Sequence, residues 1–272
     1  MSRLPVIVGF GGINAAGRSS FHAGYRRLVI DKLATNEKRE TVLSLATMMN
    51  LARYESGQFI TAEGEVVSEA ELLHRVESSV LEGTLIRKIS DGIYPANKPA
   101  PVGAAGQLPS GFQPGKIYPS RHHPRALQMS VFAASDCIKS TGIPWEIVRN
   151  HLSPDQIAVY ATSSMGQLDD DGLGGMLKAP SIGKRTTSKQ CPLGFPQMVA
   201  DFVNAYVLGS VGATGGTLGA CATFLYNLEH AVRDIQSGAR RFVLVGAAEA
   251  PVVHEVMEGY RAMGALAEDE YT

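Results

Sequence analysis

Two short apolar segments, residues 157–162 and 241–246, constrain the fold of this chain more than any other feature. Each is six residues long and mostly apolar, which is typical of a strand covered on both faces of a parallel sheet. A helix is predicted between them, because apolar residues over 222–235 recur at helical spacing and Gly238 follows at the position of a C-terminal cap. Strands that alternate with helices in this way predict an α/β fold.

The remaining segments predict one further buried strand, one weak strand, several helices and two loops. Residues 5–10 are apolar and precede a glycine-rich turn at 11–17, so they are expected to form a short buried strand. The run 209–219 contains five glycines and predicts a weak strand that suits close backbone approach. Helical spacing also predicts helices over 26–53, 67–88, 124–141 and 198–208. Loops are expected over 95–119 and 169–191, which lack periodicity.

Cys221 stands where the glycine-rich run ends and the predicted helix begins. A thiol at a helix N-terminus meets the positive end of the helix dipole and unpaired N–H groups. Both favour the thiolate, which is the nucleophilic form of cysteine. A lone cysteine more commonly fills a contact between a helix and a sheet. Position alone therefore leaves two interpretations open for Cys221, a nucleophile and a packing residue.

The composition excludes several classes of function. With 272 residues, 44% of them hydrophobic, the chain can bury a sizeable core, and its net charge of −1 gives no reason to expect nucleic acid or a membrane surface as a partner. Cys137, Cys191 and Cys221 are widely spaced, which disfavours a zinc site or a disulfide framework and suits a reducing cytoplasm. No segment approaches the ~20 apolar residues of a membrane span, and no signal peptide is recognised.

Several local patterns suggest other chemistries, but each is incomplete. The glycine cluster that starts at Gly9 has Asn14 where a dinucleotide-binding fingerprint needs its third glycine. Thr223 stands where the nucleophile elbow of α/β-hydrolases has its second glycine. The acidic turn at 169–171 is too compressed for a calcium loop. The basic residues of 178–189 either attract an acidic carrier or a phosphate, or belong to a solvated loop.

Several motifs occur in the order found in the β-ketoacyl-acyl-carrier-protein synthases, and the chain resembles this family over nearly its whole length. Residues 219–223, Gly-Ala-Cys-Ala-Thr, are similar to the family's nucleophile motif, and 245–250 are similar to a strand end of the family in which Ala247 replaces a glycine. Further similar pieces lie at 6–12, 162–166, 237–238 and 263–266. Within the family the longer FabY-type synthases, which start fatty acid synthesis, are most similar at 9–12, 14–22 and 105–109.

This resemblance implies a thiolase-like α/β fold of two similar halves, of which residues 1–272 would supply the first. It also implies a family-specific helical and linker excursion over 20–118 and a core over 119–272 that carries the nucleophile helix. The family is usually dimeric, so a homodimer is expected. Two histidines, a lysine and a glycine-rich loop of the family belong to the second half, and the two histidine motifs, H-G-T and G-H-x-x-G, do not occur in these 272 residues.

The activity implied by the resemblance is decarboxylative Claisen condensation in fatty acid synthesis. Cys221 would accept acetyl or another short acyl group from coenzyme A or acyl carrier protein, with its own backbone N–H as half of an oxyanion hole, and malonyl-acyl carrier protein would be the second substrate. Met165, Phe195 and Met198 would line the acyl pocket. No metal and no cofactor are implied. The chain alone is expected not to condense, and the alternative is a non-catalytic subunit that binds acyl carrier protein or assists assembly.

Overall fold

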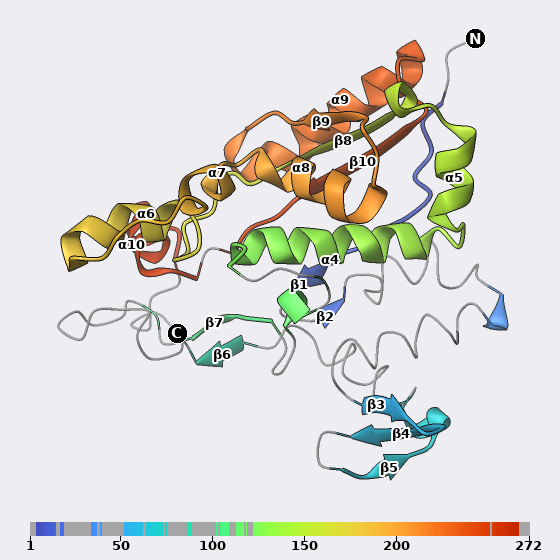
Figure 1. Ribbon diagram of the computed structural model, residues 1–272, viewed down its shortest axis with the longest axis horizontal. Helices are drawn as coiled ribbons and strands as arrows, with labels where there is room; N and C mark the ends of the chain where they lie inside the picture. Colours follow the sequence, from blue (N-terminus) through green and yellow to red (C-terminus); the bar gives the residue numbers. More distant parts are fainter. Residues whose placement is uncertain are drawn as a thin grey trace.

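A three-stranded parallel sheet forms the centre of the fold, with the strand order β10–β8–β9 (Figure 1). The strands are β8 (Ile157–Thr162), β9 (Ala213–Gly215) and β10 (Phe242–Ala247). Because all three run in the same direction, their carboxyl ends meet at one edge of the sheet. The α/β class and the two strands predicted from apolar segments are confirmed, and the glycine-rich run contributes three strand residues.

The computed structural model describes most of the chain after residue 121 and shorter pieces before it. The described residues are 4–14, 17–18, 34–36, 39, 52–61, 64–72, 74, 86–88, 102, 104–108, 113–116, 118, 122–250 and 252–266. None of the helices among these residues is both long and apolar enough to cross a membrane.

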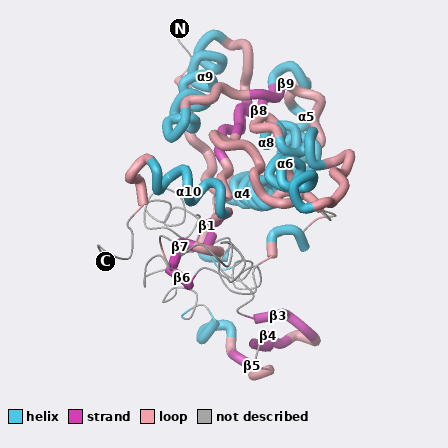
Figure 2. The backbone as a smooth tube through the Cα atoms, turned by 90° about the vertical axis from the view of Figure 1, so that its left-hand side faces the viewer, coloured by secondary structure: helices cyan, strands magenta, loops and turns pink. Residues whose placement is uncertain are grey.

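Helices cover both faces of the sheet. α4 (Arg125–Ser140) and α8 (Met198–Val203) pack on one face, and α9 (Thr223–Ser237) packs on the other (Figures 1 and 2). Alternate side chains of β8 enter the two layers, and all six of its residues are buried. β10 is less enclosed than predicted, since Leu244 is its one buried residue.

The long helices agree with the sequence predictions. α4 follows Pro124 and ends before Gly142, which has a φ of +69°. α9 ends at Gly238 in the left-handed conformation, as predicted for a glycine cap. α8 continues as a π-helix, η6 (Asn204–Leu208), so the helix predicted over 198–208 is confirmed with a wider final turn.

The loop predicted over 169–191 is wrong in part, because three short helical segments lie within or across it. They are α6 (Leu173–Lys178), η5 (Ala179–Ile182) and α7 (Gln190–Gly194). Each is four to six residues long, which is too short for a helical period to appear in the sequence. Hydrogen bonds between separate segments help to hold them: the Gln167 N–H donates to the Gly194 carbonyl (2.9 Å), and Gln190 Nε2 donates to the Asp170 carbonyl (2.9 Å).

The buried strand predicted over 5–10 is also wrong. These residues pair with no strand in the described part of the chain, and three of their large apolar side chains, Val6, Ile7 and Val8, are exposed. The segment ends against α4, where the Phe10 N–H donates to Ser140 Oγ (2.9 Å) and the Gly12 N–H donates to Asp136 (3.1 Å). A Cβ on Gly11 would overlap with the α4 backbone, so glycine allows this close approach.

The excursion over 20–118 contains strands as well as helical residues. An antiparallel sheet, β3 (Ala52–Glu55), β4 (Gln58–Thr61) and β5 (Val66–Val67), replaces the end of the helix predicted over 26–53, most of which lies outside the described residues. Its first turn has Ser56 and Gly57 at positive φ, and the Ser-Gly pair between strand-like residues was an available hairpin signal. The end of the helix predicted over 67–88 is wrong, because β6 (Ile86–Lys88) pairs with β7 (Ala104–Gly106).

The remaining elements frame this arrangement. The glycine-rich turn near the N-terminus is a hairpin of β1 (Ile13–Asn14) and β2 (Gly17–Arg18). The other segments are η3 (Pro114–Lys116), α5 (Trp145–His151), η4 (Pro154–Gln156), η7 (Ala220–Ala222) and α10 (His254–Ala262). The resemblance implies that the chain divides into an excursion and a core at residue 119, and this division stays a prediction.

Candidate active site

The carboxyl edge of the central sheet gathers three segments, two of which carry the predicted site residues Met165 and Cys221. One segment follows β8 at residues 163–167, one follows β9 at 216–221, and one follows β10 at 248–249. The Ala248 N–H donates to the Thr162 carbonyl (3.4 Å), which holds the ends of β8 and β10 together. In open α/β sheets, ligands bind at this edge.

Cys221 occupies the middle of η7, the single turn that immediately precedes α9. The hydroxyl of Thr223 closes this turn, because Oγ1 accepts the Gly219 N–H (3.1 Å) and donates to the Ala220 carbonyl (2.7 Å). Thr223 itself is buried, whereas the Cys221 side chain is exposed. The thiol therefore does not fill a contact between helix and sheet, so the interpretation of Cys221 as a packing residue is wrong.

The backbone beside the thiol adopts an uncommon conformation. Ala220 has a φ of +48°, one of three positive values among the described residues other than glycine. A non-glycine residue in this region costs about 1–3 kcal/mol and persists only where surrounding contacts impose it. Gly219 lies against the ring of Tyr226, where a Cβ would overlap with ring carbons. This turn resembles a nucleophile elbow in its strain, although its sequence departs from that motif.

Glu249 joins the β8 and β10 segments through its carboxylate. Oε1 accepts hydrogen bonds from the Ser164 N–H and from Ser164 Oγ (2.8 Å), and Oε2 accepts one from Ser163 Oγ (3.1 Å). The sequence indicated Glu249 only as part of a strand-end motif, without a role. Its bonds span more than 80 residues of sequence, so no local pattern could have identified them.

Tyr260 of α10 shares the electrostatic surroundings of Cys221 and Glu249. Burial raises the pKa of the Tyr260 hydroxyl, and the charges of Glu249 and of a Cys221 thiolate raise that pKa further. Tyr260 was not predicted as a site residue, because its helix lies outside the motif that carries Cys221. The Tyr260 hydroxyl is therefore close enough to both Glu249 and Cys221 to feel their charges.

Two of the three predicted pocket residues are brought together, and the third is not. The Ser163 N–H donates to the Pro196 carbonyl (3.1 Å) and the Gln167 N–H donates to the Gly194 carbonyl (2.9 Å). These two bonds bracket Met165 on one segment and Phe195 on the other, and the two residues are 41% and 48% exposed. Met198, at the start of α8, is half-buried and packs against the main hydrophobic core instead.

The basic residues of 178–189 differ in whether an acidic side chain lies close to them. Lys178 lies 3.2 Å from Glu255 and 3.7 Å from Asp170. Lys184, Arg185 and Lys189 are exposed, and they form no ion pair within the described part of the chain. An excess of positive charge thus remains on the surface next to α7.

No metal site is found among the residues that the structure describes: no three of their His, Cys, Asp and Glu side chains form a group able to hold an ion. His230 of α9, the histidine nearest to Cys221 in the sequence, stacks on Tyr160 with ring centroids 4.2 Å apart. Tyr160 in turn hydrogen-bonds Asp234. This pair lies on the helix–sheet contact of α9.

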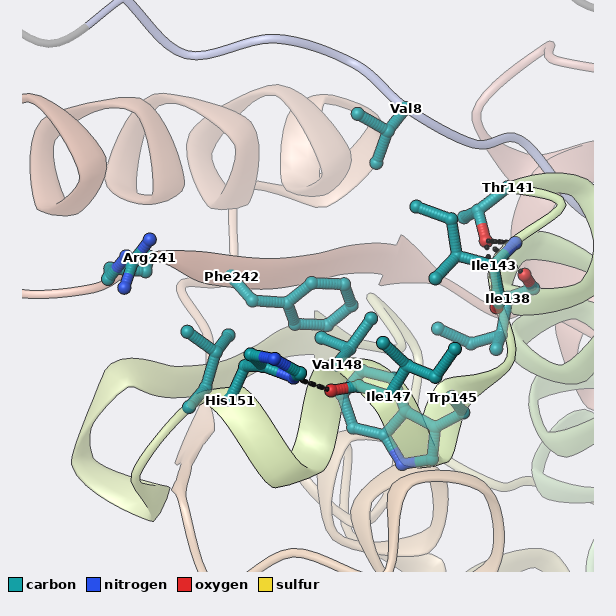
Figure 3. Close-up of a pocket in the computed structure, with 11 residues that line it drawn as sticks. Val8, Ile138, Thr141, Ile143, Trp145, Ile147, Val148, His151, Arg241 and Phe242 are labelled. Atoms are coloured by element: carbon teal, nitrogen blue, oxygen red, sulfur yellow. Dashed lines mark hydrogen bonds between the residues drawn. The ribbon is translucent and has the colours of Figure 1, made fainter.

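A cavity of about 380 Å³ lies at the opposite end of the sheet (Figure 3). It is lined mainly by apolar side chains of α4, α5 and the start of β10, with Val8 on its other side. The ring of Trp145 lies 5.0 Å from that of Phe242, and its indole N–H donates to the Leu208 carbonyl (2.7 Å). The cavity is therefore separate from the segments that carry Cys221.

Comparisons with known proteins converge on one family. Residues 116–272 match the family model described as the N-terminal domain of beta-ketoacyl synthase. The chain is 43% identical to Beta-ketoacyl-[acyl-carrier-protein] synthase FabY of Pseudomonas aeruginosa over an alignment of 330 residues, which covers 99% of this chain and 52% of that protein. It is 27% identical to 3-oxoacyl-[acyl-carrier-protein] synthase 2 of Staphylococcus aureus over 158 residues, which covers 56% of this chain and 36% of that protein.

Solved structures agree. The crystal structure of the noncanonical ketosynthase FabY from P. aeruginosa superposes with a TM-score of 0.80 over 99% of this chain and 52% of that chain. The ishigamide ketosynthase/chain length factor, at 18% identity, superposes with a TM-score of 0.59 over 99% of this chain and 53% of that chain, and so shares the fold. The chain thus spans about half the length of the FabY relative.

Proposed function

This chain belongs to the β-ketoacyl synthase family, and on that premise we propose that Cys221 accepts an acyl group from a thioester. One observation carries the proposal: an exposed thiol lies in a strained turn directly before α9, at the carboxyl edge of a parallel sheet. The thiol stands at the start of α9, where the positive end of the helix dipole lies. The short turn also presents the sulfur to solvent, where a substrate can reach it.

The proposed acyl transfer has two bond changes. The Cys221 thiolate attacks the carbonyl carbon of an acyl thioester, and a tetrahedral oxyanion forms. The oxyanion collapses, the bond from carbon to the donor sulfur breaks, and the departing thiolate takes a proton from water. The backbone N–H of Cys221 is proposed as one donor to the oxyanion. The product is an acyl thioester on Cys221.

In the whole reaction of the family, the acyl group would then move to a second substrate. Malonyl-acyl carrier protein would lose carbon dioxide, and the resulting carbanion would attack the carbonyl carbon of the acyl group on Cys221. The bond from that carbon to the Cys221 sulfur would then break, and Cys221 would leave as a thiolate. The histidine motifs that assist this step in the family do not occur in the 272 residues. We therefore expect the chain alone to be acylated without forming a ketoacyl product.

Met165 and Phe195 are proposed to border the acyl group, and Met198 to form its inner wall. The two hydrogen bonds that bracket Met165 and Phe195 support the first part of this proposal, because they keep the two side chains on facing segments. Support for Met198 is weaker, since its contacts are with the main core. Acetyl or another short acyl group is the proposed cargo.

Acyl carrier protein is the proposed partner. The names of FabY and of the Staphylococcus synthases include acyl carrier protein, and one solved structure with a similar fold is of a type II PKS acyl-carrier protein in complex with its ketosynthase. The exposed Lys184, Arg185 and Lys189 would attract an acidic carrier. A cytoplasmic location is proposed from the three free cysteines.

The test is incubation of the 272-residue chain with labelled acetyl-CoA, followed by peptide mapping. We expect label on Cys221, loss of that label in Cys221→Ala, and no ketoacyl product after malonyl-acyl carrier protein is added. Label on Cys191 instead of Cys221 would contradict the assignment of the nucleophile. Ketoacyl product from the chain alone would contradict the expectation that it does not condense.

The alternative is a non-catalytic subunit that binds the carrier or assists assembly. An epoxide directed at ketosynthase cysteines separates the two proposals. Selective modification of Cys221 over Cys137 and Cys191 supports the enzyme. Equal modification of the exposed thiols, or none at all, supports the scaffold.

A further inference from the structure

Asn227 is a polar side chain with no exposed surface, six residues after Cys221 on α9. Its amide closes a circuit of three hydrogen bonds. Oδ1 accepts the Thr217 N–H (2.7 Å), Nδ2 donates to Thr162 Oγ1 (3.2 Å), and the Thr162 hydroxyl donates to the Thr217 carbonyl (3.4 Å). Every group in the circuit has a donor or acceptor role consistent with its neighbours.

The circuit joins three parts of the fold. Thr162 is the last residue of β8 and is also fully buried, Asn227 belongs to α9, and Thr217 belongs to the loop between β9 and Cys221. The loop is pressed against the other two partners at Gly216. A Cβ there would lie 2.7 Å from Thr162 Cγ2 and 2.8 Å from Asn227 Oδ1. Only glycine allows the loop to approach this closely.

Asn227 and Thr223 together fasten the loop to α9 at two places. Thr223 holds Gly219 and Ala220, and Asn227 holds Thr217. Cys221 follows directly after these attachments, beside the left-handed Ala220. Positive φ is costly for alanine, so this conformation depends on the contacts around the turn, which include the attachments to Thr223 and Asn227.

We propose that Asn227 is a positioning residue for Cys221, which keeps the loop on the end of β8 and so keeps the thiol at the start of α9. The proposal rests on the proposed role of Cys221 as the acyl acceptor. Asn227 acts through the loop backbone and touches neither substrate nor sulfur. Its loss is expected to displace the thiol by a small distance, and a misplacement of ~1 Å can reduce a reaction rate by about a hundredfold.

The test measures two rates in the full 272-residue chain with Asn227→Ala and Asn227→Asp. One is the alkylation rate of each cysteine as a function of pH, resolved by peptide mapping, and the other is acyl transfer from labelled acetyl-CoA. Cys191 serves as an internal control for general loosening. Ser140→Ala is the matched control, since Ser140 is also buried and ties a loop to a helix, away from Cys221.

For Asn227→Ala we expect acyl transfer to fall about tenfold to a hundredfold and the alkylation profile of Cys221 to change, with Cys191 unchanged. Asn227→Asp is expected to approach the wild type at low pH, because a protonated carboxyl has both an acceptor and a donor, and to depart from it as the carboxyl ionises. Ser140→Ala should alter neither rate at Cys221.

Thr162→Val keeps the proposal testable if Asn227→Ala does not fold, since it opens the same circuit with a side chain of similar shape. Unchanged rates at Cys221 in the folded variants, or equal changes at Cys191 and in Ser140→Ala, would overturn the proposal. A wild-type chain that takes no acyl label at Cys221 would instead overturn the proposed function. In that case the alkylation profiles alone still decide whether Asn227 positions the thiol.

Discussion

The three cysteines of this chain have the same chemistry but very different surroundings. Cys191 and Cys221 are exposed, whereas Cys137 lies on α4, beside the segment at 9–12. Burial raises the pKa of the Cys137 thiol from its ordinary value of 9.0 to about 12, and the neighbouring Asp136 adds to that rise. Sequence spacing alone could not separate these three thiols.

We predict that iodoacetamide at pH 8 modifies Cys191 and Cys221 and leaves Cys137 unmodified. A pKa raised by about three units lowers the thiolate fraction at this pH about a thousandfold, and reactivity should return only as the pH approaches 12. Peptide mapping by mass spectrometry measures this directly. In denaturant all three should react alike, and rapid labelling of Cys137 in the native chain would refute the prediction.

At the residue scale the sequence predicted the start of a helix at Cys221 and hence a candidate nucleophile. It did not predict Glu249 or Asn227 as contributors, because their hydrogen bonds join residues up to 86 positions apart. Sequence patterns describe residues that are close along the chain, whereas these contacts form only when β8, α9 and β10 pack together. Met165 and Phe195 were proposed from family resemblance, and their pairing became visible only in the backbone bonds between the two segments.

At the scale of elements, the regular segments were predictable where length allowed a period to show. α4 and α9 each run for four turns, and β8 lies within the predicted bounds. One kind of error falls on short elements such as α6. The other falls on residues 5–10, which have the apolar composition of a strand but pair with no strand among the described residues. Pairing is a tertiary property, so composition cannot supply it.

Two glycines allow a paired test of how tightly these elements pack. Gly259 lies inside α10, where an added Cβ would meet only open space, so Gly259→Ala should stabilise the fold by about 0.5–1 kcal/mol and raise Tm by a few degrees. Gly11→Ala should destabilise it by about 1–3 kcal/mol, because the methyl group meets the α4 backbone. Thermal melts measure both, and equal effects of the two substitutions would contradict this account of the packing.

At the scale of the whole molecule, apolar side chains gather around the Cys221 turn and the first turn of α9. Leu218, Phe224, Leu225 and Tyr226 are between 44% and 64% exposed. Exposed apolar side chains that gather in one segment are candidates for an association site. The homodimer expected from the family therefore has a candidate surface in this chain, next to the proposed acyl acceptor.

We predict that the chain elutes above its monomer mass in size-exclusion chromatography with light scattering, and that Leu225→Ser shifts it towards the monomer. Removing one exposed leucine weakens association through the apolar area it would bury. Leu177→Ser is the matched control, because Leu177 is 69% exposed on α6, away from this surface. A monomeric wild type, or equal shifts in both variants, would contradict the prediction.

Trp145 has a further value, since it is the single tryptophan of the chain. Its indole is bonded to the end of the π-helical turn and lies against the first residue of β10, at the sheet edge opposite Cys221. Intrinsic fluorescence excited at the indole therefore reports, without any label, on the packing of that one junction. Chemical events at the thiol and structural events at the cavity can accordingly be followed in the same sample as two independent signals.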